Sequence, residues 1–266
     1  MDRVSISLAQ FRACHAVTAK WEGGKVDHPK DPGGRTAYGV TQRVYDAYRR
    51  GRGLATRDVY SIDQDEVHAI YLRDYWAASG AGRLAPGYDL VVYDASVNSG
   101  VGRGPRWFQS AVGVAPDGKI GTKTIAAAQA AKDGVAVIQR ACAARLGFLK
   151  GLGTWRTFGR GWANRVSDIE ARAAKMWLAA TGRPVAETLR NEGNKAAATA
   201  RKDATAAAGA AGGSAAASTQ DAVTTLPLSV LAVAGVIVAV VIVIAALRSA
   251  NNRSRARAYA RAALEI

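Results

Sequence analysis

Residues Trp21 to Thr41, WEGGKVDHPKDPGGRTAYGVT, decide how the first part of this 266-residue chain folds. The apolar residues that lead into this stretch recur at spacings of three or four, which predicts an amphipathic helix from about Ser7 to Trp21. These residues are Leu8, Phe11, Cys14, Val17 and Trp21. Gly23 and Gly24 then stop the helix, so that Glu22 projects from its last turn. A helix fixed in a core positions a carboxylate more firmly than a loop does.

A long loop follows Glu22 and extends to about Thr36, and structureless loops of this length in compact domains are usually functional. Asp31 begins the turn sequence DPGG within it. The aromatic, acidic and hydroxyl side chains near Glu22 are Trp21, Asp27, Asp31, Thr36, Tyr38 and Thr41. Cleavage of a glycosidic bond needs a carboxyl that donates a proton and a second group that stabilises the transition state or activates water. Aromatic surface disfavours the charged form of a carboxyl, and Trp21 or Tyr38 can provide such surface.

The remainder of the globular part is predicted to be mainly α. The predicted helices cover residues 42–50, 61–76, 107–112, 122–132, 135–152 and 161–180, with either Thr122 or Thr124 as the start of the fourth. Thr41 is expected to cap the first of them, and Ser61 or Asp63 the second. The apolar segment from Leu90 to Val101 fits a helix or a strand by its periodicity.

The last third of the chain differs in composition. Residues 184–225 are rich in Ala, Thr, Gly and Ser and lack aromatic residues, which predicts a flexible linker. Leu226 to Leu247 is an uncharged run of 22 residues. As a helix this run spans roughly 33 Å, enough for the hydrocarbon core of a bilayer, so we predict a transmembrane helix. Five arginines follow in residues 248–266, which predicts a cytoplasmic tail and a periplasmic globular part, although no N-terminal secretory signal provides an export route.

The net charge of +15 favours encounter with polyanions such as anionic lipid, nucleic acid and bacterial cell wall. No single basic stripe of the kind found in nucleic-acid readers stands out, so we expect no specific nucleic-acid partner. Cys14 and Cys142 are the only cysteines, too few for a disulfide framework, and His15, His28 and His68 lack zinc-ligand spacing. We therefore predict neither a metal nor a cofactor.

The motif around Glu22 resembles that of the phage and prophage N-acetylmuramidases of glycoside hydrolase family 108, in which EGG is followed by DPGG, a Thr and GIT. The matching residues are Glu22-Gly23-Gly24, Asp31-Pro32-Gly33-Gly34, Thr36 and Gly39-Val40-Thr41. The resemblance implies a lysozyme-like fold in which Glu22 is the catalytic acid. Phage-type lysozymes also place an Asp nine residues after the Glu, a spacing that Asp31 keeps, and a Thr six residues after that Asp, where this chain has Ala37, with Thr36 one residue earlier. Asp31 can instead simply cap the turn.

A second resemblance begins at Tyr93, where YDASVNSGVGRGPRWFQSAVGVAPDGKIGTKT is similar to the predicted peptidoglycan-binding module of this family. The match is carried by Tyr93, Asp94, Asn98, Asp117, Gly118, Gly121 and Thr124, and continues at Gly161 to Val166. Asp94 and Asn98 lie one helical turn apart and can hydrogen-bond sugar or peptide. The alternative is that this segment is structural and completes the far wall of the cleft.

We therefore predict a mainly α chain with a lysozyme-like catalytic domain at 1–82, a helical peptidoglycan-binding domain at 83–183, a flexible linker at 184–225, a transmembrane helix at 226–247 and a basic tail at 248–266. The predicted catalytic residues are Glu22, Asp31 and Thr36. The predicted substrate-binding residues are Trp21, Tyr38, Thr41, Asp94 and Asn98.

The predicted function is that of an endolysin-like muramidase, whose partners are peptidoglycan and, through Leu226 to Leu247, a membrane. A lytic transglycosylase, which also needs one Glu, is the nearest alternative. A membrane-tethered wall-binding or holin-like protein without catalysis is the alternative from another class.

Overall fold

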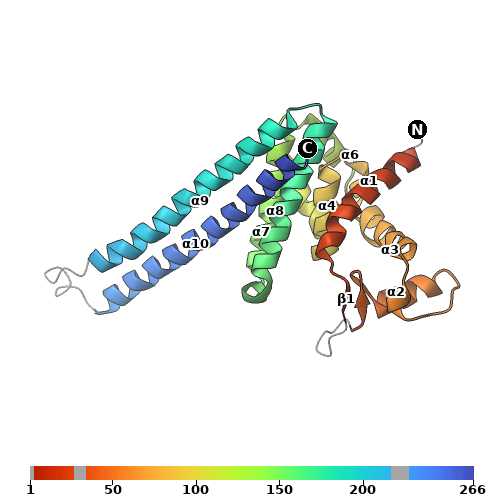
Figure 1. Cartoon of the computed structure of the whole chain (residues 1–266), viewed down its shortest axis with the longest axis horizontal. Coiled ribbons are helices and arrows are strands. Elements are labelled where there is room, and N and C mark those ends of the chain that lie inside the picture. The colour runs from red at the N-terminus through yellow and green to blue at the C-terminus, as the bar shows by residue number, and fades with distance from the viewer. Residues whose placement is uncertain (1–2, 27–33, 217–227) are drawn as a thin grey trace. The chain divides into compact units, whose positions relative to one another are not determined.

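The computed structural model of the chain describes residues 3–26, 34–216 and 228–266 (Figure 1). The chain divides into two compact units. Unit 1 comprises residues 1–152 and 176–182, and unit 2 comprises residues 153–175 and 183–266. Helices dominate both units, so the mainly α fold class is confirmed.

Unit 1 contains the helices up to residue 150 and all the strands of the described ranges. Its α-helices are α1 (Arg3–Thr18), α2 (Gln42–Arg50), α3 (Gln64–Tyr71), α4 (Tyr88–Ser99), α5 (Arg103–Val112), α6 (Thr122–Ala130) and α7 (Gly134–Lys150). Its short 3₁₀ helices are η1 (Ala19–Trp21), η2 (Val59–Ser61) and η4 (Ala81–Arg83), and η3 (Leu72–Ala77) is a π-helix. The strands are β1 (Lys25–Val26), β2 (Thr36–Ala37) and β3 (Val40–Thr41).

Side-chain caps begin the two helices that follow the strands. The hydroxyl of Thr41 accepts the N–H of Val44 at the start of α2, as the sequence predicts. Asp63 and Glu66 form a capping box at the start of α3, in which each side chain accepts a backbone N–H of the other residue. Such caps satisfy N–H groups that a helix leaves without partners in its first turn.

The three strands form a small antiparallel sheet in the order β1-β2-β3. Lys25 pairs with Ala37, and Thr36 pairs with Thr41. The sheet therefore folds the segment after Glu22 back toward the end of η1, with Tyr38 and Gly39 in the turn between β2 and β3.

Helix α4 forms the centre of unit 1, and every residue from Tyr88 to Ser96 is buried. The segment for which the sequence left helix and strand open is thus a helix. It packs against α1, where the hydroxyl of Tyr93 lies 2.8 Å from Nδ1 of His15. Although the sequence places α4 after a domain boundary at residue 83, it shares this core with α1.

A carboxylate is enclosed at the start of α4. Asp89 has no exposed surface, and its Oδ1 accepts the backbone N–H groups of Gly87 and Leu90. Burial raises the pKa of Asp89 from 3.8 to about 7, although these hydrogen bonds and the nearby thiol of Cys14 oppose the shift. Between about pH 4 and pH 7, Asp89 of the folded protein therefore retains a proton that the unfolded chain has released.

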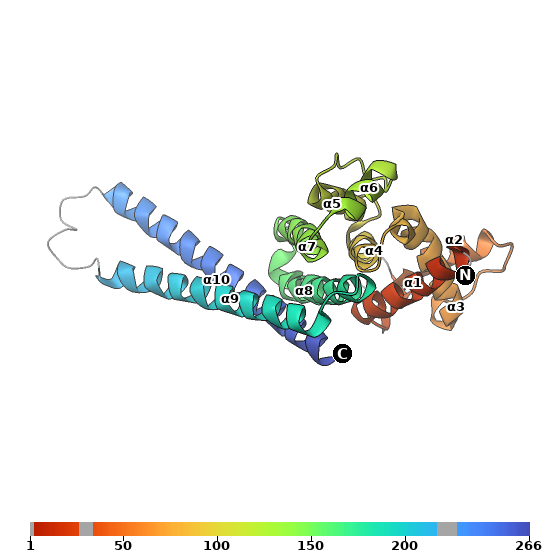
Figure 2. The same ribbon diagram turned by 90° about the horizontal axis from the view of Figure 1, so that it is seen from above.

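Unit 2 consists of most of α8 (Trp155–Ala180) together with α9 (Val185–Ala216) and α10 (Leu228–Leu264). Helices α9 and α10 lie side by side and antiparallel (Figure 2). Gly193 allows a close approach, because a Cβ there would lie 3.4 Å from Cβ of Tyr259.

The structure differs here from the linker predicted at 184–225, because residues 185–216 are helical. Alanine has the highest intrinsic helix propensity, and α10 supplies the partner that the segment lacks by itself. The buried positions of α9 that form this seam are Leu189, Gly193, Ala196 and Ala200. Residues 217–225 of the predicted linker lie outside the described residues.

The predicted basic tail continues α10 and packs against α8. Arg255 pairs with the buried carboxylate of Glu170 at 2.7 Å, and the hydroxyl of Tyr259 donates to the same carboxylate at 3.0 Å. Arg172 pairs with Glu265 at 2.9 Å. The tail is therefore a structured part of unit 2.

Helix α10 also contains residues 228–247 of the segment predicted to be transmembrane, and the first two residues of that segment lie outside the described residues. Within the described residues, one helix, Val236–Leu264, is long and apolar enough to cross a bilayer. Several of its large apolar side chains are exposed in this structure, namely Val236, Ile237, Val240, Val241, Val243, Ile244 and Leu247.

The buried Asp89 makes the stability of unit 1 dependent on pH. The native state keeps this proton up to about pH 7, whereas the unfolded chain releases it near its ordinary pKa of 3.8. The free energy of unfolding therefore decreases as the pH rises through this window, by up to about 4 kcal/mol from this group. We predict that Asp89→Asn removes this contribution, so that the variant gains stability relative to the parent between pH 4 and pH 7.

Urea unfolding at a series of pH values measures the difference. Asp65→Asn, at an exposed carboxylate in the first turn of α3, is the matched control. Parallel pH profiles of the parent and Asp89→Asn would contradict the prediction.

Candidate active site

Glu22 lies where the first helix gives way to the sheet. Helix α1 continues into η1, and the backbone N–H of Glu22 donates to the carbonyl of Ala19 to close the last turn. Gly23 has a φ of 76°, a left-handed conformation that glycine adopts readily, and it turns the chain away toward β1. The half-buried side chain of Glu22 is thus anchored by a helix whose Phe11 and Cys14 are fully buried.

The turn between β2 and β3 lies against the side chain of Glu22. A Cβ at Gly39 would lie 3.0 Å from Oε2 and 3.3 Å from Cβ of Glu22, and it would overlap with the hydroxyl of Tyr71. Gly39 also has a φ of 76°, and Tyr38 before it has a φ of 52°, which is uncommon for a residue with a side chain. The turn therefore brings backbone close to the carboxylate at a place where only glycine fits.

Tyr71 connects α3 to this turn, because its hydroxyl donates to the carbonyl of Tyr38 at 3.0 Å. The π-helix η3 follows Tyr71 directly and carries Tyr75. Burial, and then the charge of Glu22, raise the pKa of Tyr75. The rings of Tyr71 and Tyr75 lie 5.3 Å apart. π-Helical turns are rare and occur often at functional sites.

An aromatic cluster of His15, Tyr71 and Tyr93 lies at the end of the site that faces the core. His15 lies between Tyr71, with ring centroids 4.7 Å apart, and Tyr93, with its Nδ1 2.8 Å from that hydroxyl. Burial, and then the proximity of His68, lower the pKa of His15 to about 4. His15 is therefore neutral at physiological pH and adds no positive charge to the cluster.

Two tyrosines near Glu22 are thus part of the site, although the sequence assigns them no role beyond membership of the helix predicted over residues 61–76. Tyr71 and Tyr75 are four residues apart, a spacing that fits a packed helical face equally well. The signal that could have indicated more is the pair of hydroxyls, since a buried tyrosine usually bonds a polar partner.

The other predicted residues of the loop have diverse surroundings. Asp31 lies outside the described residues. Thr36 is on β2, and its hydroxyl donates to the carbonyl of Gly34 at 3.0 Å. Thr41 caps α2, and Trp21 is half-buried directly before Glu22. The chain thus places Trp21, Tyr38 and Thr41 near Glu22 in sequence. Tyr38 is held through its backbone carbonyl, which accepts the hydroxyl of Tyr71.

Asp94 and Asn98, predicted to contact substrate, bind an arginine instead. Arg145 of α7 pairs with Asp94 at 2.6 Å and donates to Oδ1 of Asn98 at 3.0 Å. The side chains of Asp94 and Arg145 are 0% and 2% exposed. A buried ion pair of this kind fixes α4 to α7, which favours the structural interpretation of this segment.

The geometry provides a carboxylate fixed by a helix end and a glycine turn and bordered by tyrosine side chains. Such a group can donate a proton to an oxygen of a substrate that enters from the exposed side. The long loop after Glu22 and the sheet lie on the chain immediately beside it, where loops commonly carry substrate contacts.

Comparison with known proteins agrees with this chemistry. The family model for glycosyl hydrolase 108 matches residues 15–100, and the model for a predicted peptidoglycan domain matches residues 103–167. Among solved structures, that of Brucella abortus SagA is 39% identical in sequence, with a TM-score of 0.55. That similarity covers 62% of this chain and 94% of the SagA chain. A search of curated proteins gave no match.

The fold, the fixed carboxylate and these matches define a glycoside hydrolase with a peptidoglycan-binding region. More specifically, the chain belongs to the glycosyl hydrolase 108 family.

The role of Gly39 is testable by adding one methyl group. We predict that Gly39→Ala lowers hydrolysis of peptidoglycan by roughly 100-fold. The new Cβ would overlap with the hydroxyl of Tyr71 and lie 3.0 Å from Oε2 of Glu22, so it displaces both side chains. Clearing of a peptidoglycan suspension measures the rate.

Gly53→Ala is the matched control, since Gly53 has a φ of 69° and a Cβ there would meet no atom within 4 Å. Both variants introduce the same backbone strain, but only the first one crowds the site. Equal losses of activity in the two variants would show that the contact with Glu22 is unimportant.

Proposed function

We propose that the chain is an endolysin-like N-acetylmuramidase, which cleaves the β-1,4 bond between N-acetylmuramic acid and N-acetylglucosamine in peptidoglycan. The observation that carries this proposal is the position of Glu22. It lies within the segment that the family model matches, at the end of η1, and Gly39 brings the turn between β2 and β3 against its carboxylate.

Glu22 acts as the general acid in this mechanism. It donates its proton to the oxygen that leaves with N-acetylglucosamine while the bond from that oxygen to the muramic acid carbon breaks. Water then adds to this carbon and returns a proton to Glu22, which restores the starting state. The hydroxyl of Tyr71 is directed to the carbonyl of Tyr38, so the turn keeps its position beside the carboxylate during the reaction.

Asp31 or Thr36 is proposed to stabilise the positive charge that develops on the sugar or to hold the water. Asp31 keeps the spacing from Glu22 found in phage-type lysozymes. Thr36 is placed by the pairing of β2 with β1 and β3, which returns this part of the loop toward Glu22.

Substrate is proposed to contact Trp21 and Tyr38 on either side of Glu22 along the chain, with Thr41 at the base of the same sheet. The region that matches the peptidoglycan domain, residues 103–167, would hold the wall polymer for repeated cleavage. Asp94 and Asn98 support this region through Arg145, and a direct contact with sugar would require that buried pair to open.

The apolar part of α10 is proposed to attach the enzyme to a membrane. Its length and its exposed Val and Ile side chains support this attachment. The arrangement predicted from the arginines, with a cytoplasmic tail and a periplasmic globular part, stays a prediction.

Replacement of the acid tests the proposed chemistry. We predict that Glu22→Gln reduces cleavage of peptidoglycan roughly 100- to 10,000-fold, because the amide cannot donate the proton of a carboxyl, while binding to the wall is retained. A zymogram and a cosedimentation assay measure the two properties. Glu187→Gln, at an exposed position of α9, is the control for the change of charge. A Glu22→Gln band that clears as well as the parent would contradict the assignment.

Lytic transglycosylase activity is the second candidate, because that reaction also needs one acid. There, the C6 hydroxyl of muramic acid attacks C1 and forms an anhydro ring in place of the addition of water. Among the described residues, Gly39, Tyr71 and Tyr75 lie near Glu22, and these residue types suit either reaction.

Mass spectrometry of the released muropeptides separates the two reactions. We predict reducing ends that take up oxygen from isotopically labelled water. Ends that are lighter by one water and carry no label would assign the transglycosylase reaction instead.

A further inference from the structure

The tail of α10 and helix α8 are in direct contact. The hydroxyl of Ser254 donates to Oδ1 of Asn164 at 2.9 Å, and Arg255 pairs with Glu170 at 2.7 Å. Tyr259 has no exposed surface and bonds the same carboxylate. If the apolar part of α10 crossed a bilayer once, the tail and α8 would lie on opposite faces, and none of these contacts could form.

Helices α9 and α10 form an antiparallel hairpin, and their charged residues end at the same level along it. Asp203 is the last charged residue of α9, and Arg248 is the first of α10. The hydroxyl of Ser249 donates to the carbonyl of Ala200 at 2.8 Å, and Asn252 donates to Asp203 at 2.9 Å. Beyond this level both helices are uncharged to their ends at Ala216 and Leu228.

The uncharged part of α10 has the length of a bilayer core. Residues 228–247 of α10 extend roughly 30 Å as a helix, which is the thickness of the hydrocarbon layer. Val236, Ile237 and Val243 are 64%, 58% and 56% exposed. The facing part of α9 is made of Ala, Thr, Gly and Ser, and small residues of this kind let helices pack closely in lipid.

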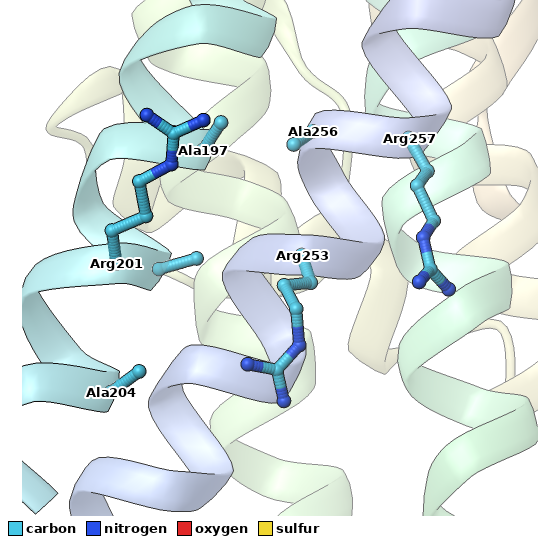
Figure 3. A pocket seen from close by; sticks show the side chains of 7 residues that line it. Ala197, Arg201, Ala204, Arg253, Ala256 and Arg257 are labelled. Atoms are coloured by element: carbon cyan, nitrogen blue, oxygen red, sulfur yellow. The ribbon is translucent and has the colours of Figure 1, made fainter. Parts of the chain in front are cut away.

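Arginines from both helices line a groove at the level where the charges end (Figure 3). The groove has a volume of about 300 Å³, and its polar residues are Arg201 of α9 and Arg253 and Arg257 of α10. All three arginines are exposed. Among the described residues, no carboxylate pairs with Arg201 or Arg257, whereas Arg253 donates to the hydroxyl of Ser249. Guanidinium groups bind phosphate oxygens with two parallel hydrogen bonds.

We propose that α9 and α10 enter an anionic phospholipid bilayer together as a helical hairpin, with the C-terminal tail and α8 on the same face and the arginine groove at the phosphate headgroups. The partner is the bilayer, because the apolar length fits its hydrocarbon core and the groove lies at the depth of its charged surface. This inference is independent of the catalytic proposal.

The hairpin also avoids an energetic barrier of the single crossing. A tail that crossed the bilayer would carry five arginines through hydrocarbon, and charged side chains are costly there. In the hairpin these arginines stay in the headgroup region, and Arg255 keeps its contact with Glu170.

A disulfide between the tail and α8 tests the topology in the full chain. In Asn164→Cys/Ser254→Cys the two sulfurs replace side chains that now form a hydrogen bond. The variant is mixed, oxidised or reduced, with sealed vesicles of phosphatidylcholine and phosphatidylglycerol, and insertion is measured by flotation and resistance to carbonate extraction. The parent, whose Cys14 and Cys142 are buried, controls for oxidation.

The hairpin predicts that the oxidised variant inserts to the same extent as the reduced variant and the parent. If oxidation abolishes insertion and reduction restores it, the tail must leave α8 to cross the bilayer, and the proposal is overturned. It is also overturned if the parent stays off the vesicles as a dimer in sedimentation, because a second copy then covers the apolar face.

The arginine groove is tested with Arg201→Gln/Arg257→Gln against Arg156→Gln/Arg160→Gln, which removes the same charge from exposed positions of α8. We expect the first variant to bind anionic vesicles at least roughly tenfold more weakly than the parent, and the second to lose much less. Equal losses of vesicle binding would show that the groove contributes only its general positive charge, and this would overturn its proposed role. Inhibition of vesicle binding by inorganic phosphate, beyond that of chloride at the same ionic strength, would identify a site for free phosphate and overturn the lipid assignment.

Discussion

Gly39 lies between the carboxylate of Glu22 and the hydroxyl of Tyr71, and the active site depends on the absence of a side chain there. Three segments meet at this point: the end of η1, the turn between β2 and β3, and the end of α3. Each one is held by its own structure, through the buried face of α1, the pairing of the short strands and the bond from Tyr71 to the carbonyl of Tyr38. A catalytic acid needs such support, because a displacement of about 1 Å is enough to reduce catalysis substantially.

The region that matches the peptidoglycan domain is continuous with the support of this site. Tyr93 of α4 contacts His15 of α1, and Asp94, the next residue in the chain, pairs with Arg145 of α7. The same helix therefore holds the aromatic cluster below Glu22 on one side and anchors α7 on the other. This explains why the motif around Tyr93 contains polar residues that are completely buried: removal of either partner of a buried ion pair leaves an uncompensated charge.

In unit 2, contacts between helices override the structure that composition alone predicts for two segments. Residues 185–216 have the composition of a spacer, yet they form a helix because α10 covers their Ala and Gly positions. The tail, predicted from its arginines to lie across a membrane from the globular part, has Arg255 and Tyr259 bound to Glu170 of α8. Composition describes what a segment does alone, whereas these two segments are determined by contacts between residues 49 and more positions apart in the chain.

The sequence by itself determined the helical class, the caps of α2 and α3, the position of Glu22 at a helix end and the family, because these depend on local periodicity, on capping residues and on a motif of consecutive residues. It also identified the apolar run of α10, since hydrophobic length needs no partner to be recognised. Only the tertiary structure decided that Tyr71 and Tyr75 border Glu22, that Asp94 is enclosed with Arg145, and that α9 is a helix. A tyrosine, an aspartate or an alanine has the same local pattern whether it faces a ligand, an ion partner or solvent, and the fold alone brings its distant neighbours within reach.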